Sequence, residues 1–115
     1  MRIHHVALRV ADVARALGFY AGVLGLQELE RRGSSDGLAA AWLEAGEIVL
    51  MLEQRLRGQG AGAGSAHVLA FHIDDVAAWE TRLAAAGVAI DDRTPHTIYV
   101  RDPDGHRVGL TTYRD

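Results

Sequence analysis

The chain has 115 residues and an apolar share of 49%, which fits one globular domain with its own hydrophobic core. It has no cysteine, so disulfides, thiolate nucleophiles and sulfur-ligated metals are excluded. A net charge of −3 without a basic stripe argues against nucleic acid as a partner. The sequence shows no apolar run of membrane-span length and no signal-peptide core, so we expect a cytoplasmic protein without membrane spans.

The first half of the chain reads as a strand, a helix and three further strands. Residues 2–10 alternate between apolar and polar side chains and favour a strand. Asp12 stands where a helix N-cap is expected, apolar residues follow from Val13 at helical spacing, and Gly25 comes just after the expected helix end. The three further strands are predicted over residues 26–32, 38–45 and 47–54.

The second half repeats this order. The stretch "RGQGAGAGSA", residues 57–66, has no hydrophobic periodicity and lacks the context of a phosphate loop, so it is predicted to be a flexible connector. After it, "HVLAFHIDDV" follows the pattern of "HHVALRVADV", with Asp75 placed 63 positions after Asp12 as a second helix cap and Gly87 closing that helix. The strands "TIYVRD" and "HRVGLTTY" then flank the turn "DPDG", after a short segment near residues 88–91.

A pattern repeated once across the chain indicates a duplicated module. Each half is a βαβββ unit, so the sequence predicts an α+β fold of two tandem modules within a single domain, residues 1–115. Module one is expected over residues 1–56, the connector over 57–66 and module two over 67–115.

The segments "HHVALRVADVARALGFYAGVLGLQ" and "YVRDPDGHRVGL", with the tandem layout, resemble the vicinal oxygen chelate superfamily. That superfamily contains glyoxalase I, extradiol dioxygenases, fosfomycin and bleomycin resistance proteins, and methylmalonyl-CoA epimerase. The resemblance covers nearly the whole chain. It implies a curved sheet whose concave side forms a cleft, with the helices on the convex side.

The resemblance also implies where a metal would bind. In metal-dependent members, each module supplies a first-strand histidine and a last-strand glutamate to one divalent ion, whose open positions polarise bound oxygen atoms. His5 matches the histidine of module one. The other three positions fall on Leu50, Val68 and Gly109, and none of these side chains binds a metal. The resemblance therefore implies no cofactor, with a divalent metal near His5 as the alternative.

Neighbouring residues do not restore this ligand set if the strands are regular. One step along a strand turns a side chain to the opposite face, so His4 and His67 are out of phase unless a bulge carries His67 into the cleft. His72 lies about 13 Å from position 68 at ~3.3 Å per residue, too far to share an ion with it. Glu53, three residues past Leu50, is expected to point away from the cleft.

The same phase predicts the residues of the concave face. They are mostly apolar or small with a few polar groups, which is typical of a small-molecule pocket, although loops or a partner subunit plugging the face is the alternative. No acidic residue is expected there, so Arg9 is predicted to bind a ligand carboxylate, phenolate or carbonyl, unless it reaches solvent or pairs with Asp74 or Asp102. The predicted ligand-binding residues are His5, Arg9, Leu50, Val68, His72, Tyr99, Gly109 and Thr111. Ala7, Leu52 and Ala70 are expected on the concave face as well.

Two functions of different classes follow from the resemblance. One is a metal-independent protein that sequesters a small molecule, as bleomycin-resistance proteins do. The other is a lyase, isomerase or dioxygenase that uses a divalent metal with a non-standard ligand set. Positions 50, 68 and 109 favour the binding protein, and a metal-free enzyme using His5 or His72 as a general base stays open. The sequence does not identify the ligand.

The superfamily usually completes its cleft by pairing modules within or between chains, and each module here has only four strands. We therefore expect a homodimer, with the pairing of modules left open. Light scattering at micromolar concentration checks this, and the mass of a single chain would contradict it.

Overall fold

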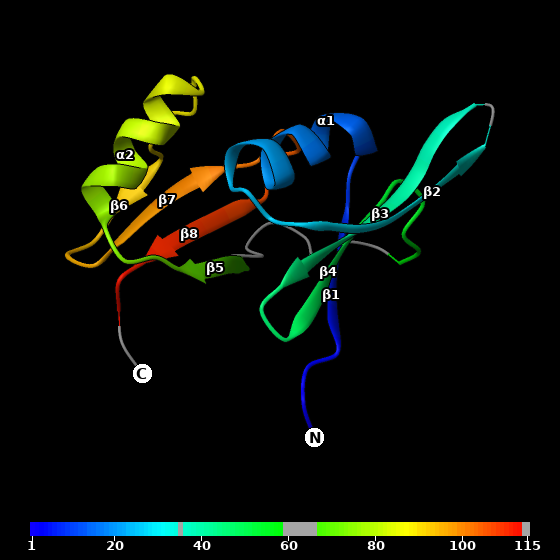
Figure 1. Cartoon of the computed structure of the whole chain (residues 1–115), viewed down its shortest axis with the longest axis horizontal. Coiled ribbons are helices and arrows are strands. Elements are labelled where there is room, and N and C mark those ends of the chain that lie inside the picture. Colours follow the sequence, from blue (N-terminus) through cyan, green and yellow to red (C-terminus); the bar gives the residue numbers. More distant parts are fainter. Residues whose placement is uncertain (35, 59–66, 114–115) are drawn as a thin grey trace. The chain divides into compact units, whose positions relative to one another are not determined.

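The structure, a computed structural model, describes residues 1–34, 36–58 and 67–113. It divides into two compact units, Met1–Gln59 and Gly60–Asp115, each with a four-stranded sheet and its own helix (Figure 1). Within the described part of the chain, no helix is long and apolar enough to cross a membrane. Most of the expected connector, residues 59–66, lies outside the described residues.

The first unit has the predicted order of strand, helix and three strands. The helix begins as predicted, with the Asp12 carboxylate accepting from the Arg15 amide at 3.1 Å, but its second half is a π-helix, which sequence periodicity does not reveal. In the sheet order β1-β4-β3-β2, β1 runs parallel to β4 and the other pairs are antiparallel. The elements are β1 (His5–Arg9), α1 (Val13–Leu17), η1 (Gly18–Val23), β2 (Glu28–Ser34), β3 (Gly37–Ala45) and β4 (Ile48–Glu53).

The second unit repeats that topology, with the sheet order β5-β8-β7-β6 and β5 parallel to β8. Asp75 caps its helix by accepting from the Ala78 amide at 3.2 Å, as Asp12 does in the first unit. Gly25 and Gly87 follow the two helices with φ of 82° and 74°, a backbone conformation that favours glycine. The elements are β5 (Val68–His72), α2 (Val76–Ala85), β6 (Asp92–Arg93), β7 (Thr97–Arg101) and β8 (Arg107–Thr111). The α+β fold of two tandem βαβββ modules is thus confirmed.

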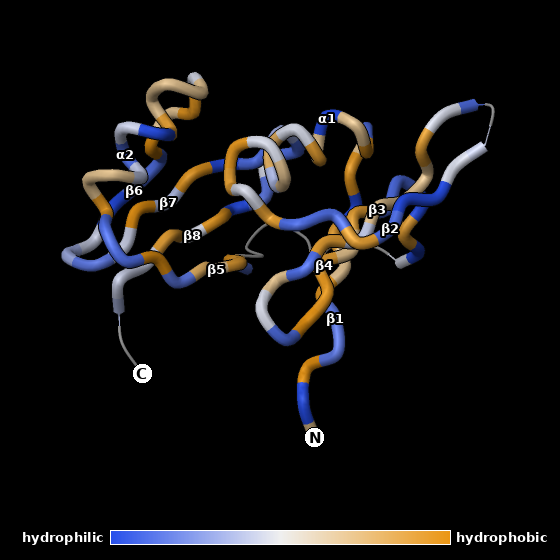
Figure 2. Tube along the Cα trace, in the orientation of Figure 1, coloured by the Kyte–Doolittle hydropathy of each residue, from blue (hydrophilic) through white to orange (hydrophobic). Residues whose placement is uncertain are grey.

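Each sheet buries one face. In the first unit the buried face carries Ala41, Leu43, Leu50 and Leu52, and α1 packs on β3 and β4. In the second unit the buried side chains come from alternate positions of the strands, with Leu83 added by α2. They are Ile98, Val100, Val108 and Leu110. Figure 2 shows hydrophobic stretches along β4, β7 and β8, whereas β2 at the edge is largely hydrophilic.

The turn between β7 and β8 is organised by Asp102, a buried carboxylate. Its Oδ1 accepts from the amides of Asp104 at 2.9 Å and His106 at 2.8 Å, and its own amide donates to the His106 carbonyl at 3.0 Å. These bonds satisfy main-chain donors inside a tight turn, which is a common role of aspartate there. The turn fixes where β8 begins and therefore which β8 residues face each side.

The two faces of β4 give a direct test of this packing. Leu50 is 1% exposed, so Leu50→Ala is expected to lower the free energy of unfolding by about 2–5 kcal/mol. Its neighbour Met51 is half-buried on the other face, and Met51→Ala is expected to cost only about 1 kcal/mol. Urea unfolding measures both, and an equal or reversed ranking would show that β4 has the opposite phase.

Candidate functional site

The open face of the first sheet, opposite α1, carries His5, Ala7 and Arg9. The register pairs these residues with Val49, Met51 and Glu53 of β4, so all six side chains lie on one face. The prediction that Leu50 and Leu52 share this face was wrong, because both are fully buried on the side of α1. In a strand as uniformly apolar as β4, alternation does not reveal the phase.

The open face of the first sheet carries an acidic residue, contrary to the prediction. Glu53 was expected to point away and the face to hold no acid, but Glu53 is the register partner of Arg9. The Arg9 guanidinium donates to main-chain carbonyls, with Nε 2.9 Å from the Leu56 oxygen and Nη2 bonded to both Leu56 and Gly58. Arg9 therefore fastens the segment after β4, which gives this arginine a structural role.

His5 lies at the start of β1, and among the described residues the side chains around it do not form a metal site. Its Nδ1 is 2.9 Å from that of His4, and its register partner on β4 is Val49. Glu53 shares the face but stands four residues along the strand, about 13 Å away at ~3.3 Å per residue. Two adjacent imidazoles without a nearby carboxylate do not reproduce a histidine and glutamate set.

The open face of the second sheet carries Val68, Ala70 and His72 of β5 beside Arg107, Gly109 and Thr111 of β8. The pairing runs without a register shift, so β5 contains no bulge that would turn a neighbouring side chain into this face. The Thr111 hydroxyl lies 2.8 Å from that of Thr97 and 3.3 Å from the His96 carbonyl. These bonds occupy Thr111 within the sheet.

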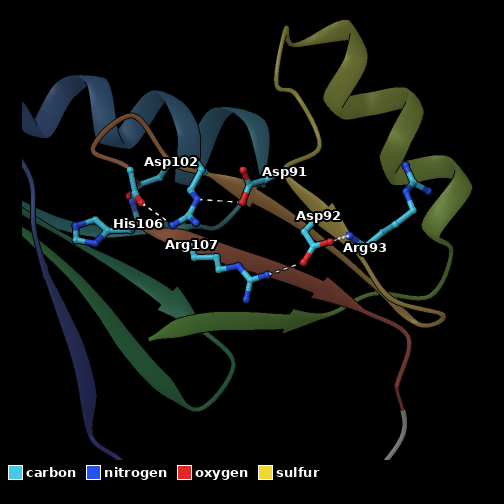
Figure 3. A network of polar contacts seen from close by, with 8 residues as sticks. Asp91, Asp92, Arg93, Asp102, His106 and Arg107 are labelled. Carbon is cyan, nitrogen blue, oxygen red and sulfur yellow. Dashed lines mark hydrogen bonds and ion pairs between the residues drawn. The ribbon is translucent and has the colours of Figure 1, made fainter. Parts of the chain in front are cut away.

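Tyr99 of β7 takes the space above Gly109. A Cβ placed on Gly109 would stand 3.3 Å from Cε1 of the Tyr99 ring and 3.4 Å from the Ala70 Cβ. The guanidinium carbon of Arg107 lies 3.9 Å from the centroid of the same ring, and Nη2 donates to the Asp92 carboxylate at 3.1 Å (Figure 3). The Tyr99 ring therefore lies against the residue where the resemblance implies a metal-binding carboxylate, and Arg107 lies over that ring.

The first sheet has a matching row. Trp42 of β3 is the register partner of Met51, as Tyr99 is of Gly109, and Met51 also pairs with Ala7 as Gly109 does with Ala70. The residue of module one equivalent to Gly109 is therefore Met51, and the assignment to Leu50 is corrected by one position.

An arginine and an acidic residue also lie beside the Trp42 ring. Arg32 of β2 lies 4.5 Å from the ring centroid and is 3.5 Å from Glu30, the register partner of Trp42. Arg32, Trp42 and Arg107 were not among the residues predicted for the site. Arg107 was within reach, because it precedes Gly109 by two residues and so shares its face.

The divalent ion used by metal-dependent relatives does not fit these residues. Neither sheet pairs a histidine with a carboxylate at the expected positions, and Gly109 is covered by the Tyr99 ring. Across residues 1–34, 36–58 and 67–113, no three His, Asp or Glu side chains gather closely enough to hold a metal ion.

Residues 2–110 match the Glyoxalase/Bleomycin resistance protein/Dioxygenase superfamily. The chain is 28% identical over 95% of its length to a curated sequence named as a probable lactoylglutathione lyase of Vibrio cholerae, 88% of which is covered.

Solved structures give the same picture. An antibiotic-binding protein from Streptomyces sp. CB03234 superimposes with a TM-score of 0.76 at 25% identity, with 96% of this chain and 94% of that one covered. A lactoylglutathione lyase from Agrobacterium tumefaciens gives a TM-score of 0.72 at 24% identity, with 96% and 92% covered, which supports the fold alone. The resemblance seen in the sequence is confirmed.

The contact between Tyr99 and Gly109 predicts a specific coupling. Gly109→Val places a branched side chain where the Tyr99 ring lies, so we expect a loss of about 1–3 kcal/mol in the free energy of unfolding. In a Tyr99→Ala background the same substitution is expected to cost less, with a coupling of about 0.5–3 kcal/mol measured by urea unfolding of all four chains. Strict additivity would show that the ring does not rest on Gly109.

Proposed function

The chain belongs to the Glyoxalase/Bleomycin resistance protein/Dioxygenase superfamily, and from this premise we propose that it binds a small molecule without a metal ion, as a sequestering protein. The observation that carries the proposal is the covered Gly109. Gly109 has no side chain to bind a metal, the Tyr99 ring lies against it, and the Arg107 guanidinium lies over the ring. In the proposed function, aromatic and cationic contacts take the place of metal coordination at this position.

The composition of the open faces supports this proposal. They combine aliphatic and small side chains, such as Met51, Val68 and Ala70, with an aromatic ring and a few oriented polar groups. Binding sites for small molecules have this mixture, because apolar surface supplies affinity and a few polar groups fix the orientation. Val68 is 44% exposed, a high value for a valine in a strand, which leaves apolar surface for a ligand.

The second candidate is a metal-dependent enzyme, favoured by the similarity to proteins named as probable lactoylglutathione lyases. It requires a ligand set built around His5 that differs from the superfamily pattern. The enzyme would require a metal ion and the binding protein would not, so a measurement of metal dependence distinguishes the two functions.

We expect a thermal-shift screen of natural-product antibiotics, with EDTA present throughout, to find compounds that raise Tm. A compound at 100 times its Kd adds about 2.7 kcal/mol to the free energy of unfolding. Mass spectrometry of the recovered compound is expected to show it unchanged, as sequestration requires.

Elemental analysis of protein purified without a His-tag supplies the control. The proposal predicts substoichiometric Zn, Ni, Fe and Mn and an unchanged metal content in His5→Ala. Stoichiometric metal lost in His5→Ala, together with turnover of a bound compound, would contradict the proposal and establish the enzyme.

A further inference from the structure

The two open faces carry the same three-part arrangement of an aromatic ring, an arginine lying over it and an acid from the edge strand. In the first sheet these are Trp42, Arg32 and Glu30, and in the second they are Tyr99, Arg107 and Asp92. The aromatic residues occupy equivalent positions, as do the acids, since Glu30 pairs with Trp42 and Asp92 with Tyr99. The arginines come from different strands, β2 and β8, so sequence duplication by itself does not account for the shared arrangement.

In the second sheet, Arg107 is held by the Tyr99 ring and by Asp92, but only some of its hydrogen-bond donors are paired. The flat guanidinium rests on Tyr99, and its side chain is 26% exposed. Among the described residues, its hydrogen-bond partner is a single oxygen of Asp92, reached through Nη2. A guanidinium has five donors in a planar fork, so Nε and Nη1 remain available for a further acceptor.

The ion pair between Asp92 and Arg107 is exposed to solvent on the Asp92 side. Asp92 is 59% exposed, and its Oδ1 accepts from the Arg93 amide at 2.8 Å. An exposed ion pair of this kind contributes little to stability, whereas a bidentate contact between an arginine and an anionic group is short and strong. The Tyr99 hydroxyl has no hydrogen-bond partner within the described part of the chain. It therefore adds a donor at the edge of the ring that Arg107 contacts.

We propose that the open face of the second sheet binds an acidic oxygen group of a planar ligand through Arg107, with Tyr99 and the aliphatic Ala70 and Val68 beside it. This rests on the proposed function and names the class of its ligand as a planar aromatic or conjugated anion, such as a carboxylate or sulfonate. The arginine determines specificity for the anion, and the apolar surface binds the ring system.

The test uses two dyes of similar ring system and different charge on the full chain. The anionic probe is 8-anilinonaphthalene-1-sulfonate and the neutral probe is N-phenyl-1-naphthylamine, each titrated by fluorescence with EDTA present. Arg107→Gln is expected to weaken the anionic dye about tenfold or more, since a hydrogen bond to a charged group is lost, and to change the neutral dye less than about twofold.

Arg93→Gln is the matched control. Arg93 is an arginine of the same unit that is paired with Glu80 at 2.9 Å and lies in register with the buried Ile98, so it belongs to the other face. The proposal predicts that this variant binds both dyes as the parent does. An equal loss of anionic dye in both variants would reduce the effect to net charge and overturn the inference.

Asp92→Asn keeps the inference testable if Arg107→Gln fails to fold, which circular dichroism shows. Removing the competing carboxylate is expected to tighten the anionic dye about twofold to fivefold, while the neutral dye is unchanged. Weaker or unchanged anionic binding in Asp92→Asn would overturn the inference.

The affinities of the parent chain separate this inference from the proposed function. If the parent binds both dyes with equal affinity and Arg107→Gln leaves the two affinities equal, the ligand class is wrong but small-molecule binding stands. If neither dye binds the parent, this inference is wrong, and the antibiotic screen separately decides the proposed function.

Discussion

The packing of the Tyr99 ring over Gly109 connects the structure of the second sheet with its chemistry. A glycine inside a strand contributes no side chain to packing, so its presence in β8 is explained only by what approaches it. Here a ring fills the space, an arginine lies on the ring, and an edge-strand carboxylate holds the arginine. A Cβ at position 109 would lie 3.3 Å from the ring, so a side chain there would require the ring to shift slightly.

The turn before β8 fixes the register of β8 and therefore the position of Arg107 and Gly109. The buried Asp102 fixes the "DPDG" turn through two main-chain amides, and β8 then runs parallel to β5 without a register shift. Because side chains alternate along a strand, Arg107 and Gly109 face one side while Val108 and Leu110 enter the core. The same logic in the first unit places Met51 on the open face and Leu50 under α1, so the stability of the fold and the composition of the open face are set by one register.

Much of the fold was readable from the sequence. Asp12 and Asp75, with the glycines that close the helices, identified the duplication, and with it the order of elements along each half of the chain. The π-helical η1 was not predictable, because the π and α patterns of apolar residues differ too little over six positions. In the site, the glycine at position 109 was a usable signal, but the phase of β4 was not, since "IVLMLE" is apolar on both sides. The carbonyl partners of Arg9, Leu56 and Gly58, were not predicted, because they belong to an irregular segment that sequence patterns do not describe.

The proposed function depends on an aromatic and cationic surface at position 109 in place of metal coordination. Calorimetric titration of an aromatic sulfonate into the protein tests it most directly, once with excess EDTA and once with added zinc. The account predicts the same affinity and enthalpy in both titrations and loss of the binding heat in Arg107→Gln. Binding that appears only with zinc, and that survives Arg107→Gln, would contradict it.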